Sequence, residues 1–371
     1  MQHPVKVNIS PASFANNIRY LRRLVAPAKL CVVMKSDAYG HGLEALAPVA
    51  AEAGADCIGV CTNPEAAVVR RLLPGMTILR LRGALSEEYD ESVASLGIEE
   101  QVGSLQAAEY LNTLGQRRGR PVPVHLKIDT GMGRSGFFPH QVEILQAVCA
   151  MPGLKIVGLM THLANADAAD LDSTQRQLQR FDSLRKVLAD TLPGDVLVHT
   201  HNSAATLRLP EQRGDLVRVG AACYGVRTST EFENPPALRP VMSIRTWVME
   251  VRRVPAGTPI GYGSLFRTHR DSRIATIPVG FGEGYPRALF NKGIVLIKGR
   301  RCPVVGRVSL NITTLDITDL DVPVEWGDEV VLIGDQGSER VTFEEMADRF
   351  DSVHTELNLM AGHMNRRSYE D

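Results

Sequence analysis

The chain of 371 residues carries 41 lysines and arginines against 42 aspartates and glutamates, and 44% of its residues are hydrophobic. These values are typical of an ordinary globular protein, exclude the basic field expected of a nucleic-acid-binding protein, and give no reason to expect a polyanionic partner. The length exceeds what one hydrophobic core normally supports, so we expect a large domain and a smaller one.

The N-terminal segment MQHPVKVNISPAS has no apolar run behind a basic flank, so we expect no secretory signal. No window of the sequence is long and apolar enough for a membrane span, and we expect no membrane partner. The six cysteines lie mostly inside apolar runs, which favours buried thiols in a reducing compartment. Together these features predict a cytoplasmic protein.

Helical and strand patterns alternate over the first 235 residues, beginning with a helix that has Ser10 as N-cap and Pro11 at its first position. We expect further helices at 43–53, 63–72, 104–116, 140–150 and 171–190. The expected strands are near residues 30–34, 56–61, 76–81, 98–103, 122–128, 154–161, 195–199 and 216–220, of which IEEQVG at 98–103 is the least convincing. This pattern favours a parallel (β/α)8 barrel of the TIM type over an open sheet, although periodicity does not show closure.

The pattern changes after about residue 235, where the Pro-rich NPPALRP at 234–240 is typical of a linker. Runs such as RIATIPVGF, GIVLIKG and DEVVLIG follow, broken by Gly, Asp and Pro, and only 342–350 and 353–364 have a helical pattern. We therefore predict an α/β chain with a barrel domain over residues 1–235 and a mostly-β domain over residues 236–371.

Polar side chains stand at the ends of several expected barrel strands, where barrels of this kind build their chemistry. They are Lys35, Lys127, Arg134, His162, His199, His201, Ser203 and Arg218. Each has an ordinary structural explanation when it is taken alone. His199 and His201 alternate along a strand, so they point to opposite faces and at least one of them is expected to be structural. The structural explanation fails when it must account for the whole set.

Ser203 and Gly220 follow the seventh and eighth strands, which is where such barrels tend to bind a phosphate. With Lys35 after the first strand and Arg218 nearby in the barrel, the set suggests an aldehyde cofactor with a phosphate tail. Pyridoxal phosphate fits this description, since a lysine forms a Schiff base with it and an arginine can address its ring nitrogen.

The chain resembles the alanine racemase family over essentially its whole length. The resemblance rests on VVMKSDAYGHG, HLKIDTGMGRSGF, MTHLANAD, HNSAATLRLP, VRVGAACYGV, GYGSLFR, VGFGEGYPR and GRVSLN. It implies a pyridoxal-phosphate-dependent racemase that interconverts L- and D-alanine by a two-base mechanism and serves D-alanine biosynthesis. It also implies a homodimer with shared active sites, in which Lys35 is the base on one face of the substrate Cα and Tyr262 of the partner subunit is the base on the other.

The resemblance also implies roles for other residues. Tyr39, Ser203, Gly220, Ala221 and Tyr369 would bind the cofactor phosphate, and His162 would pack against the ring. Arg218, braced by His199, would meet the ring nitrogen. Arg134 would orient the substrate carboxylate and would itself be held by Lys127, which is often carbamylated in this family.

The chain departs from the family pattern at three positions around the substrate. Leu310 and Asn311 replace a usual Met-Asp pair, and Phe281 stands where an entrance tyrosine is usual, while Arg287 and Asp167 of the entrance are kept. Asn311 removes a negative charge from the substrate pocket. The resulting alternative is a broader-spectrum racemase that also acts on serine, lysine or arginine.

Three other interpretations use parts of the same residues. A metal-dependent amidohydrolase barrel could use His162, His199, His201 and Lys127, but it would need an HxH pair on the first strand, so we expect no metal. A non-catalytic pyridoxal-phosphate-binding protein would lack the domain that carries Tyr262. A decarboxylase shares the expected architecture at the level of fold alone.

Overall fold

The computed structural model describes residues 4–229 and 237–371. The chain divides into two compact units, which we treat separately. The barrel unit comprises Phe14–Ala38 and Leu43–Arg239, and the β-rich unit comprises Met1–Ser13, Tyr39–Gly42 and Pro240–Asp371. The expected domain boundary between residues 235 and 236, and residues 234–236 of the expected linker, lie outside the described residues.

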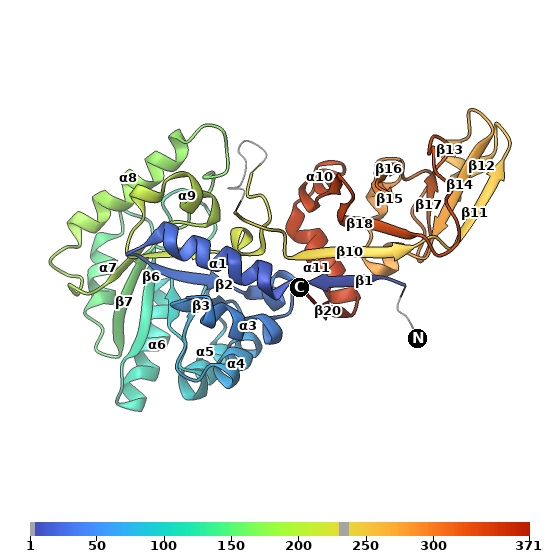
Figure 1. Cartoon of the computed structure of the whole chain (residues 1–371). Helices are drawn as coiled ribbons and strands as arrows, with labels where there is room; N and C mark the ends of the chain where they lie inside the picture. The colour runs from blue at the N-terminus through green and yellow to red at the C-terminus, as the bar shows by residue number, and fades with distance from the viewer. Residues whose placement is uncertain (1–3, 230–236) are drawn as a thin grey trace. The chain divides into compact units, whose positions relative to one another are not determined.

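All eight strands expected in the barrel are present and pair in parallel, and the chain of this unit runs from blue through green in Figure 1. They are β2 (Lys29–Val33), β3 (Cys57–Val60), β4 (Thr77–Arg80), β5 (Glu100–Val102), β6 (Val122–Lys127), β7 (Leu154–Met160), β8 (Leu197–His199) and β9 (Leu216–Val219). They form two four-stranded sheets in the orders β4-β3-β2-β9 and β5-β6-β7-β8. A parallel bridge between Leu79 and Glu99 joins one pair of edges, and the Asp215 N–H donates to the Val198 carbonyl at 2.7 Å at the other pair. The strands therefore close into the expected barrel.

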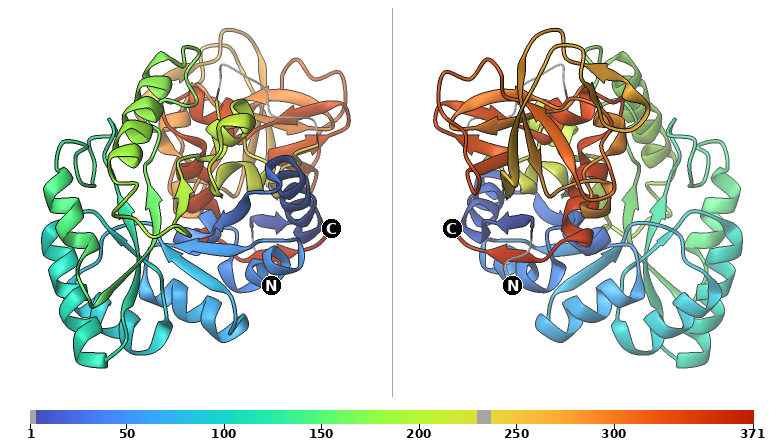
Figure 2. Two further views of the ribbon diagram at one scale, coloured as in Figure 1. Left: turned by 90° about the vertical axis from the view of Figure 1, so that its left-hand side faces the viewer. Right: turned by 90° about the vertical axis from the view of Figure 1, so that its right-hand side faces the viewer.

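Helices surround these strands, as Figure 2 shows. They are α1 (Pro11–Val25), α3 (Leu43–Glu52), α4 (Asn63–Leu72), α5 (Ser86–Glu91), α6 (Leu105–Arg118), α7 (Val142–Cys149), α8 (Asp172–Val187) and α9 (Ser203–Arg208). The short α5 and α9 were not expected from the sequence, because neither is long enough to show a helical period. None of the helices within residues 4–229 and 237–371 has the length and apolar character needed to cross a bilayer.

The alternation of side chains along β6 brings polar groups into the barrel. Val124, Leu126 and Ile128 belong to a hydrophobic cluster with residues of α6 and α7. Successive strand residues point to opposite faces, so His125 and Lys127 face the barrel interior. Both are buried.

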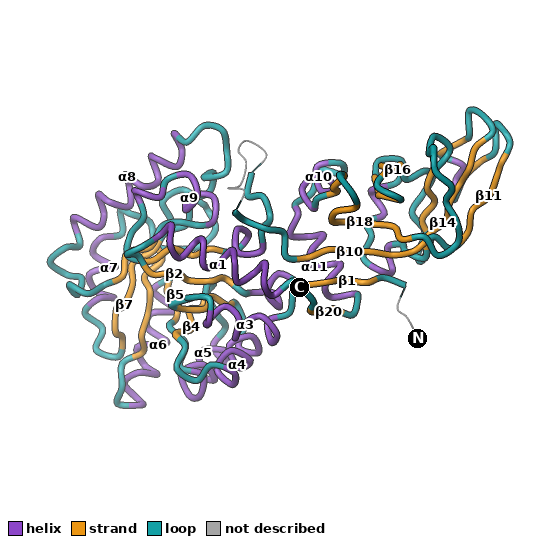
Figure 3. Tube along the Cα trace, in the orientation of Figure 1, coloured by secondary structure: helices purple, strands orange, loops and turns teal. Residues whose placement is uncertain are grey.

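The β-rich unit is built on a seven-stranded sheet. Figure 3 draws all strands in orange. The sheet order is β16 (Arg300–Pro303), β15 (Ile294–Ile297), β18 (Glu329–Gln336), β10 (Met242–Trp247), β1 (Lys6–Ile9) and β20 (Arg367–Tyr369), and β19 (Glu339–Val341) pairs with β18. A second sheet contains β11 (Glu250–Val254), β14 (Ser272–Ile277) and β17 (Thr313–Asp316), and β12 (Pro259–Ile260) pairs with β13 (Phe266–Arg267). Two helices complete the unit, α10 (Phe343–Asp348) and α11 (His354–Met364).

The N-terminal strand belongs to the β-rich unit, whereas the expected division of the chain assigned it to the barrel. β1 pairs antiparallel with β10 and parallel with β20. Val5, Val7 and Ile9 alternate along this segment and are buried. A strand with one apolar face needs a sheet and a core to cover it, and the C-terminal half of the chain supplies both.

Candidate active site

Lys35 directly follows Met34 at the carboxyl end of β2 and begins an unusual turn, α2 (Lys35–Tyr39). Ser36, Asp37, Ala38 and Tyr39 all have φ between 53° and 55°. Left-handed helical conformation costs L-residues roughly 1–2 kcal/mol each, so a run of such residues requires support from its surroundings. The turn fixes the direction in which the chain leaves Lys35.

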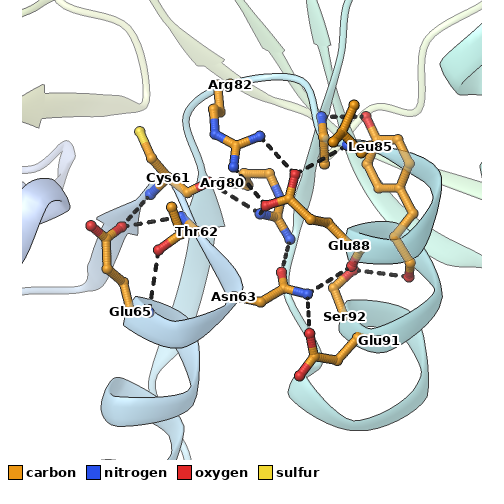
Figure 4. A network of polar contacts seen from close by, with 12 residues as sticks. Cys61, Thr62, Asn63, Glu65, Arg80, Arg82, Leu85, Glu88, Glu91 and Ser92 are labelled. Atoms are coloured by element: carbon orange, nitrogen blue, oxygen red, sulfur yellow. Dashed lines mark hydrogen bonds and ion pairs between the residues drawn. The ribbon is translucent and has the colours of Figure 1, made fainter.

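Two carboxylates support this turn within the barrel unit. Glu65 Oε1 accepts from the Ser36 N–H at 2.6 Å, and Asp37 Oδ1 accepts from the Leu43 N–H at 2.7 Å. Glu65 Oε2 also accepts from the Cys61 N–H at 2.8 Å and forms a capping box with Thr62 at the start of α4 (Figure 4). Glu65 thereby ties the Lys35 turn to the end of β3, a role that the sequence analysis did not anticipate.

The end of the turn belongs to the β-rich unit and lies beside Tyr369. His41, which is buried, has its Nδ1 3.1 Å from the Tyr39 carbonyl oxygen. A Cβ at Gly42 would lie 2.0 Å from Tyr369 Oη, so only a glycine admits this contact. Tyr39 and Tyr369, the two tyrosines expected to bind phosphate, thus belong to the same unit, and Tyr369 contacts Gly42, three residues after Tyr39.

Arg218 on β9 is buried in the barrel interior and is held by acceptors on two neighbouring strand ends. Its NH1 donates to His199 Nδ1 and to the His199 carbonyl, each at 2.9 Å. Its NH2 donates to the carbonyls of Thr161 at 2.7 Å and Thr200 at 3.4 Å. Within the described part of the chain all four terminal N–H groups therefore have acceptors, and the Nε–H remains as the donor available to a ligand.

Ser203 and the chain after β9 meet in the barrel unit. Ser203 Oγ accepts from the Gly220 N–H at 3.0 Å and from the Ala222 N–H at 3.4 Å. Neither the Ser203 hydroxyl hydrogen nor the Ala221 N–H has a protein acceptor among residues 4–229 and 237–371. The two groups are therefore available as donors to an anion.

Lys127 and His162 are surrounded by other cations. Burial, followed by the charge of Arg218, lowers the pKa of Lys127 to about 7. Burial likewise holds the pKa of His162 far below its usual range, and the charges of Arg218, Lys127, Arg134 and Lys35 lower it further. Burial and the charge of Arg218 together favour the neutral form of the Lys127 amine.

A loop presents Arg134 at the end of β6. Asp129 Oδ1 accepts from the N–H groups of Gly131, Met132 and Gly133 at 2.9, 2.9 and 3.1 Å, and Oδ2 accepts from the Arg134 N–H at 3.2 Å. Burial alone would raise the pKa of Asp129, but these N–H donors and Lys127 lower it below its usual value. In its ionised form Asp129 thereby fixes the loop. The Arg134 side chain is exposed.

The two histidines of β8 and its continuation have different surroundings. His201 has Nε2 3.0 Å from the Leu209 carbonyl and Nδ1 2.8 Å from Thr200 Oγ1, so it is the structural histidine of the pair. His199 contacts Arg218 on one side and His125 on the other, where its Nε2 is 2.9 Å from His125 Nδ1. His125 Nε2 is in turn 2.9 Å from Glu99 Oε2.

A second polar network surrounds Arg80 on β4 (Figure 4). Arg80 forms an ion pair with Glu100 and donates to Asn63 Oδ1 and to the Cys61 carbonyl. Glu100 also accepts from the Ser92 hydroxyl at 2.6 Å. IEEQVG, the least convincing of the expected strands, contains two adjacent carboxylates, and Glu99 and Glu100 each have a buried basic partner.

The remaining expected residues lie in loops. Tyr262 is 72% exposed, in a short helical turn between Gly261 and Gly263, and Phe281, Arg287, Leu310 and Asn311 are exposed in the same β-rich unit. Asn311 Nδ2 donates to Glu283 Oε1 at 2.6 Å, and Glu283 Oε2 accepts from the Gly280 N–H at 2.9 Å. Asp167 is exposed in the barrel unit, in the loop after β7.

Within residues 4–229 and 237–371, no three side chains of His, Cys, Asp or Glu are grouped so that they could hold one metal ion. His162, His199 and His201, which were considered as metal ligands, are therefore not gathered with carboxylates or cysteines in such a cluster.

Comparison with known proteins matches both halves of the chain to family models. Residues 9–228 match the model for the N-terminal domain of alanine racemase, and residues 241–369 match the model for its C-terminal domain. An alanine racemase of Syntrophobacter fumaroxidans is 38% identical over 98% of this chain and 97% of its own length. A broad specificity amino-acid racemase of Pseudomonas taetrolens is 37% identical over 98% of this chain and 89% of its own length.

Solved structures give the same result. The crystal structure of an alanine racemase from Bartonella henselae with covalently bound pyridoxal phosphate superimposes with a TM-score of 0.91. The sequence identity is 30%, and the alignment covers 100% of both chains.

Proposed function

This chain belongs to the alanine racemase family, and we propose that it interconverts L- and D-alanine with pyridoxal phosphate as its cofactor. The observation that carries the proposal is the state of Arg218. Its four terminal N–H groups are used by the protein, and the Nε–H is left for a ligand atom inside the barrel. An arginine held in this way fits the ring nitrogen of pyridoxal phosphate.

The barrel residues fit the rest of the cofactor. The Ser203 hydroxyl and the Ala221 N–H lack protein acceptors within the described residues and would donate to the phosphate, with Gly220 beside them. Tyr39 and Tyr369 would add their hydroxyl groups. His162 is held neutral by burial and surrounding cations, so it would pack against the ring without adding charge.

When bound, pyridoxal phosphate supplies an aldehyde that joins to an amine and a ring that accepts electrons from the substrate Cα. Lys35 Nζ would hold the cofactor and move a proton at one face of Cα, and Tyr262 Oη would move a proton at the opposite face. Arg218 is a cation at the ring nitrogen, so it disfavours a proton on that atom and restrains side reactions such as transamination.

Arg134 would orient the substrate carboxylate, and Lys127 would hold Arg134. The lowered pKa of Lys127 favours the neutral amine, which is the form that reacts with carbon dioxide. The reaction joins the amine nitrogen to the carbon of CO2 and releases one proton, and the carbamate would then accept from Arg134. Incubation with 13CO2 should give a carbamate carbon signal that is absent from Lys127→Met.

The cofactor assignment is tested by absorption spectroscopy. The purified chain should carry an absorption band of bound pyridoxal phosphate that borohydride removes. The reduced cofactor is then a covalent label, which should remain on Lys35 after denaturation. Lys35→Ala, which removes the amine, should not retain the label. A labelled peptide elsewhere in the chain would contradict the assignment of Lys35.

We assign the active unit as a homodimer in which Tyr262 serves the site of the other subunit. Tyr262 is 72% exposed and the loops of the same β-rich unit expose Leu265, Leu310 and Ile312, as expected for a surface that a second copy covers. A chain with Lys35→Ala and a chain with Tyr262→Phe should each be inactive.

Mixing the two inactive chains tests the sharing of the site. After reversible dissociation, a mixed dimer contains one site with both wild-type bases and should regain about a quarter of the wild-type activity, since about half of the dimers are mixed and each has one complete site. Mixing two preparations of the same variant is the control. No recovery on mixing, with dimers confirmed by light scattering, would place both bases on one chain.

A broader substrate range is a second candidate, and it is favoured by Asn311. The side chain there is a neutral amide that donates to Glu283, so position 311 contributes no carboxylate to the substrate pocket. The broad specificity racemase of Pseudomonas taetrolens is nearly as similar to this chain as the alanine racemase of Syntrophobacter fumaroxidans. A chiral assay against L-alanine, L-serine, L-lysine and L-arginine tests the range, and strict use of alanine would refute it.

The six cysteines are free thiols, which suits a reducing compartment, and we place the protein in the cytoplasm as a source of D-alanine. Cell fractionation followed by detection of the protein in the soluble cytoplasmic fraction tests this location.

A further inference from the structure

A chain of hydrogen bonds leads from Arg218 toward the outside of the barrel. It runs from Arg218 NH1 to His199 Nδ1 at 2.9 Å, from His199 Nε2 to His125 Nδ1 at 2.9 Å, and from His125 Nε2 to Glu99 Oε2 at 2.9 Å. The first three side chains are buried, and the Glu99 side chain is 26% exposed. All four belong to the barrel unit, and the proposed function assigns no role to His125 or Glu99.

The arginine at one end fixes the direction of every hydrogen bond in this chain. Arg218 has only donors, so His199 Nδ1 must be the bare nitrogen of its ring. His199 then carries its hydrogen on Nε2 and donates to His125 Nδ1. His125 must likewise be neutral with its hydrogen on Nε2, which it donates to the Glu99 carboxylate. The depressed pKa of His199, caused by burial and then by Arg218, agrees with a neutral ring.

The surrounding backbone is arranged to admit His125 at this point. A Cβ at Gly158 on β7 would lie 1.9 Å from His125 Nδ1, so a side chain there would occupy the space of the His125 ring. The pairing of β6 with β7 shifts register between Val124 and His125, and this irregularity sets Gly158 opposite His125. Irregularities of this kind re-aim side chains within a sheet.

We propose that Glu99 and His125 are positioning residues for Arg218, acting through His199. Arg218 sets the tautomers of both rings, and the Glu99 carboxylate holds the other end of the chain in place by accepting from His125. His125 in turn accepts from His199, so that the bare His199 Nδ1 stays where it orients the Arg218 guanidinium with its Nε–H toward the ligand. The inference rests on the proposed function, because it takes the ligand of Arg218 to be the cofactor ring.

In this arrangement the carboxylate of Glu99 lies at the far end of the hydrogen-bonded chain and does not contact Arg218 directly. A carboxylate bonded directly to the guanidinium would neutralise the cation that disfavours a proton on the ring nitrogen. Two neutral imidazoles keep the carboxylate at a distance, so Arg218 is oriented by a charged group and still acts as a cation at its other edge.

Nuclear magnetic resonance of the cofactor-free protein with 15N-labelled histidine tests the direction of the hydrogen bonds. In the wild type, His125 and His199 should both be neutral with hydrogen on Nε2. Glu99→Ala removes the terminal acceptor, while Arg218 still sets both tautomers, so the Nε2 resonance of His125 should shift as its hydrogen bond to the carboxylate is lost. Glu99→Gln retains an acceptor oxygen and should show a smaller shift. A wild-type His199 with its hydrogen on Nδ1, or an unchanged His125 Nε2 resonance in Glu99→Ala, would overturn the inference.

Racemisation kinetics of the loaded enzyme give the second readout. Glu99→Ala should lower kcat about tenfold, as expected for one hydrogen bond within a charged network, with KM for alanine little changed. Glu99→Gln should recover most of the loss. Glu100→Gln is the matched control, because it removes the neighbouring carboxylate from the Arg80 network and should leave the His125 Nε2 resonance and kcat unchanged. Equal kcat in Glu99→Ala and the wild type would contradict the positioning role.

Failure of the proposed function gives a different result. If the wild type has the expected tautomers but neither binds pyridoxal phosphate nor racemises amino acids, the hydrogen-bonded chain stands and the assigned ligand of Arg218 is wrong.

Discussion

Two arginines are buried in the barrel unit, and their partners differ. Arg80 has 0% exposed surface, and both oxygens of Glu100 accept from it, at 2.7 and 3.2 Å. Arg218 is 4% exposed and donates to an imidazole and to carbonyl groups, with no carboxylate oxygen in hydrogen-bond distance within the described residues. The charge of Arg80 is therefore neutralised by a carboxylate in contact with it, and the charge of Arg218 is not.

The difference separates a structural arginine from one that is ready for a ligand. A buried ion pair contributes little net stability but costs much when one partner is lost, so Arg80 and Glu100 depend on each other. Arg218 is fully hydrogen-bonded on one edge without being neutralised, and its charge is felt by Lys127 and His162. The charge of the partners, more than the burial itself, therefore indicates which buried arginine serves function.

Removing Arg80 should have the largest effect on stability. Arg80→Leu leaves Glu100 buried without its cation, and the free energy of unfolding should fall by about 3–5 kcal/mol. Urea denaturation of the purified variant measures the loss. Changing both partners, in Arg80→Leu with Glu100→Leu, should restore a large part of it, because no unpaired charge then remains.

Arg82→Leu is the matched control for this variant. Arg82 also pairs with a carboxylate, that of Glu88, but its side chain is 39% exposed, so its loss should cost less than about 1 kcal/mol. Equal denaturation midpoints for Arg80→Leu and Arg82→Leu would show that the buried pair is no more important than the surface pair.

A methyl group at Gly158 should disturb the surroundings of Arg218. Gly158→Ala would place its Cβ 1.9 Å from His125 Nδ1, and displacement of the ring should cost about 1–3 kcal/mol of stability. In the same protein His199 Nε2 should lose its acceptor on His125, and its 15N resonance should shift. Gly75→Ala, whose Cβ would meet nothing within 4 Å, should be neutral. A Gly158→Ala variant as stable as Gly75→Ala would mean that the ring moves at no cost.

The last prediction is a dependence of stability on pH. Burial and Arg218 hold the pKa of Lys127 at about 7 in the folded protein, against about 10.4 for an unfolded chain. Between these values the unfolded chain binds a proton that the folded protein lacks. The contribution of Lys127 to stability should therefore rise with pH in this window, by at most about 1.4 kcal/mol per unit.

Urea denaturation from pH 7 to 9 in carbon-dioxide-free buffer measures this slope. Lys127→Met has no group that titrates at this position, so its stability should rise less steeply than that of the wild type. Parallel curves for the two proteins would show that Arg218 and burial do not depress the pKa of Lys127.

Much of the fold could be predicted because its signals are local. The eight barrel strands, the helices at 43–53 and 171–190 and the lysine after the first strand follow from apolar periods and turn residues within short windows. The short α9 was missed, since six residues do not complete two helical turns. The position of β1 in the β-rich unit was also missed, because a strand pattern does not specify its partner strands.

Sequence alone determined the elements, the family and the residue types gathered at the strand ends, because motifs and periods are properties of neighbouring residues. Only the tertiary structure decided which polar groups meet. His125 and His199 are 74 residues apart and Glu99 and His125 are 26 apart, and nothing in either neighbourhood specifies the other partner. Adjacent Glu99 and Glu100 have different partners because β5 lies between β4 and β6. Glu99 meets His125 of β6 and Glu100 meets Arg80 of β4, since hydrogen bonds form only between groups that the fold brings within reach.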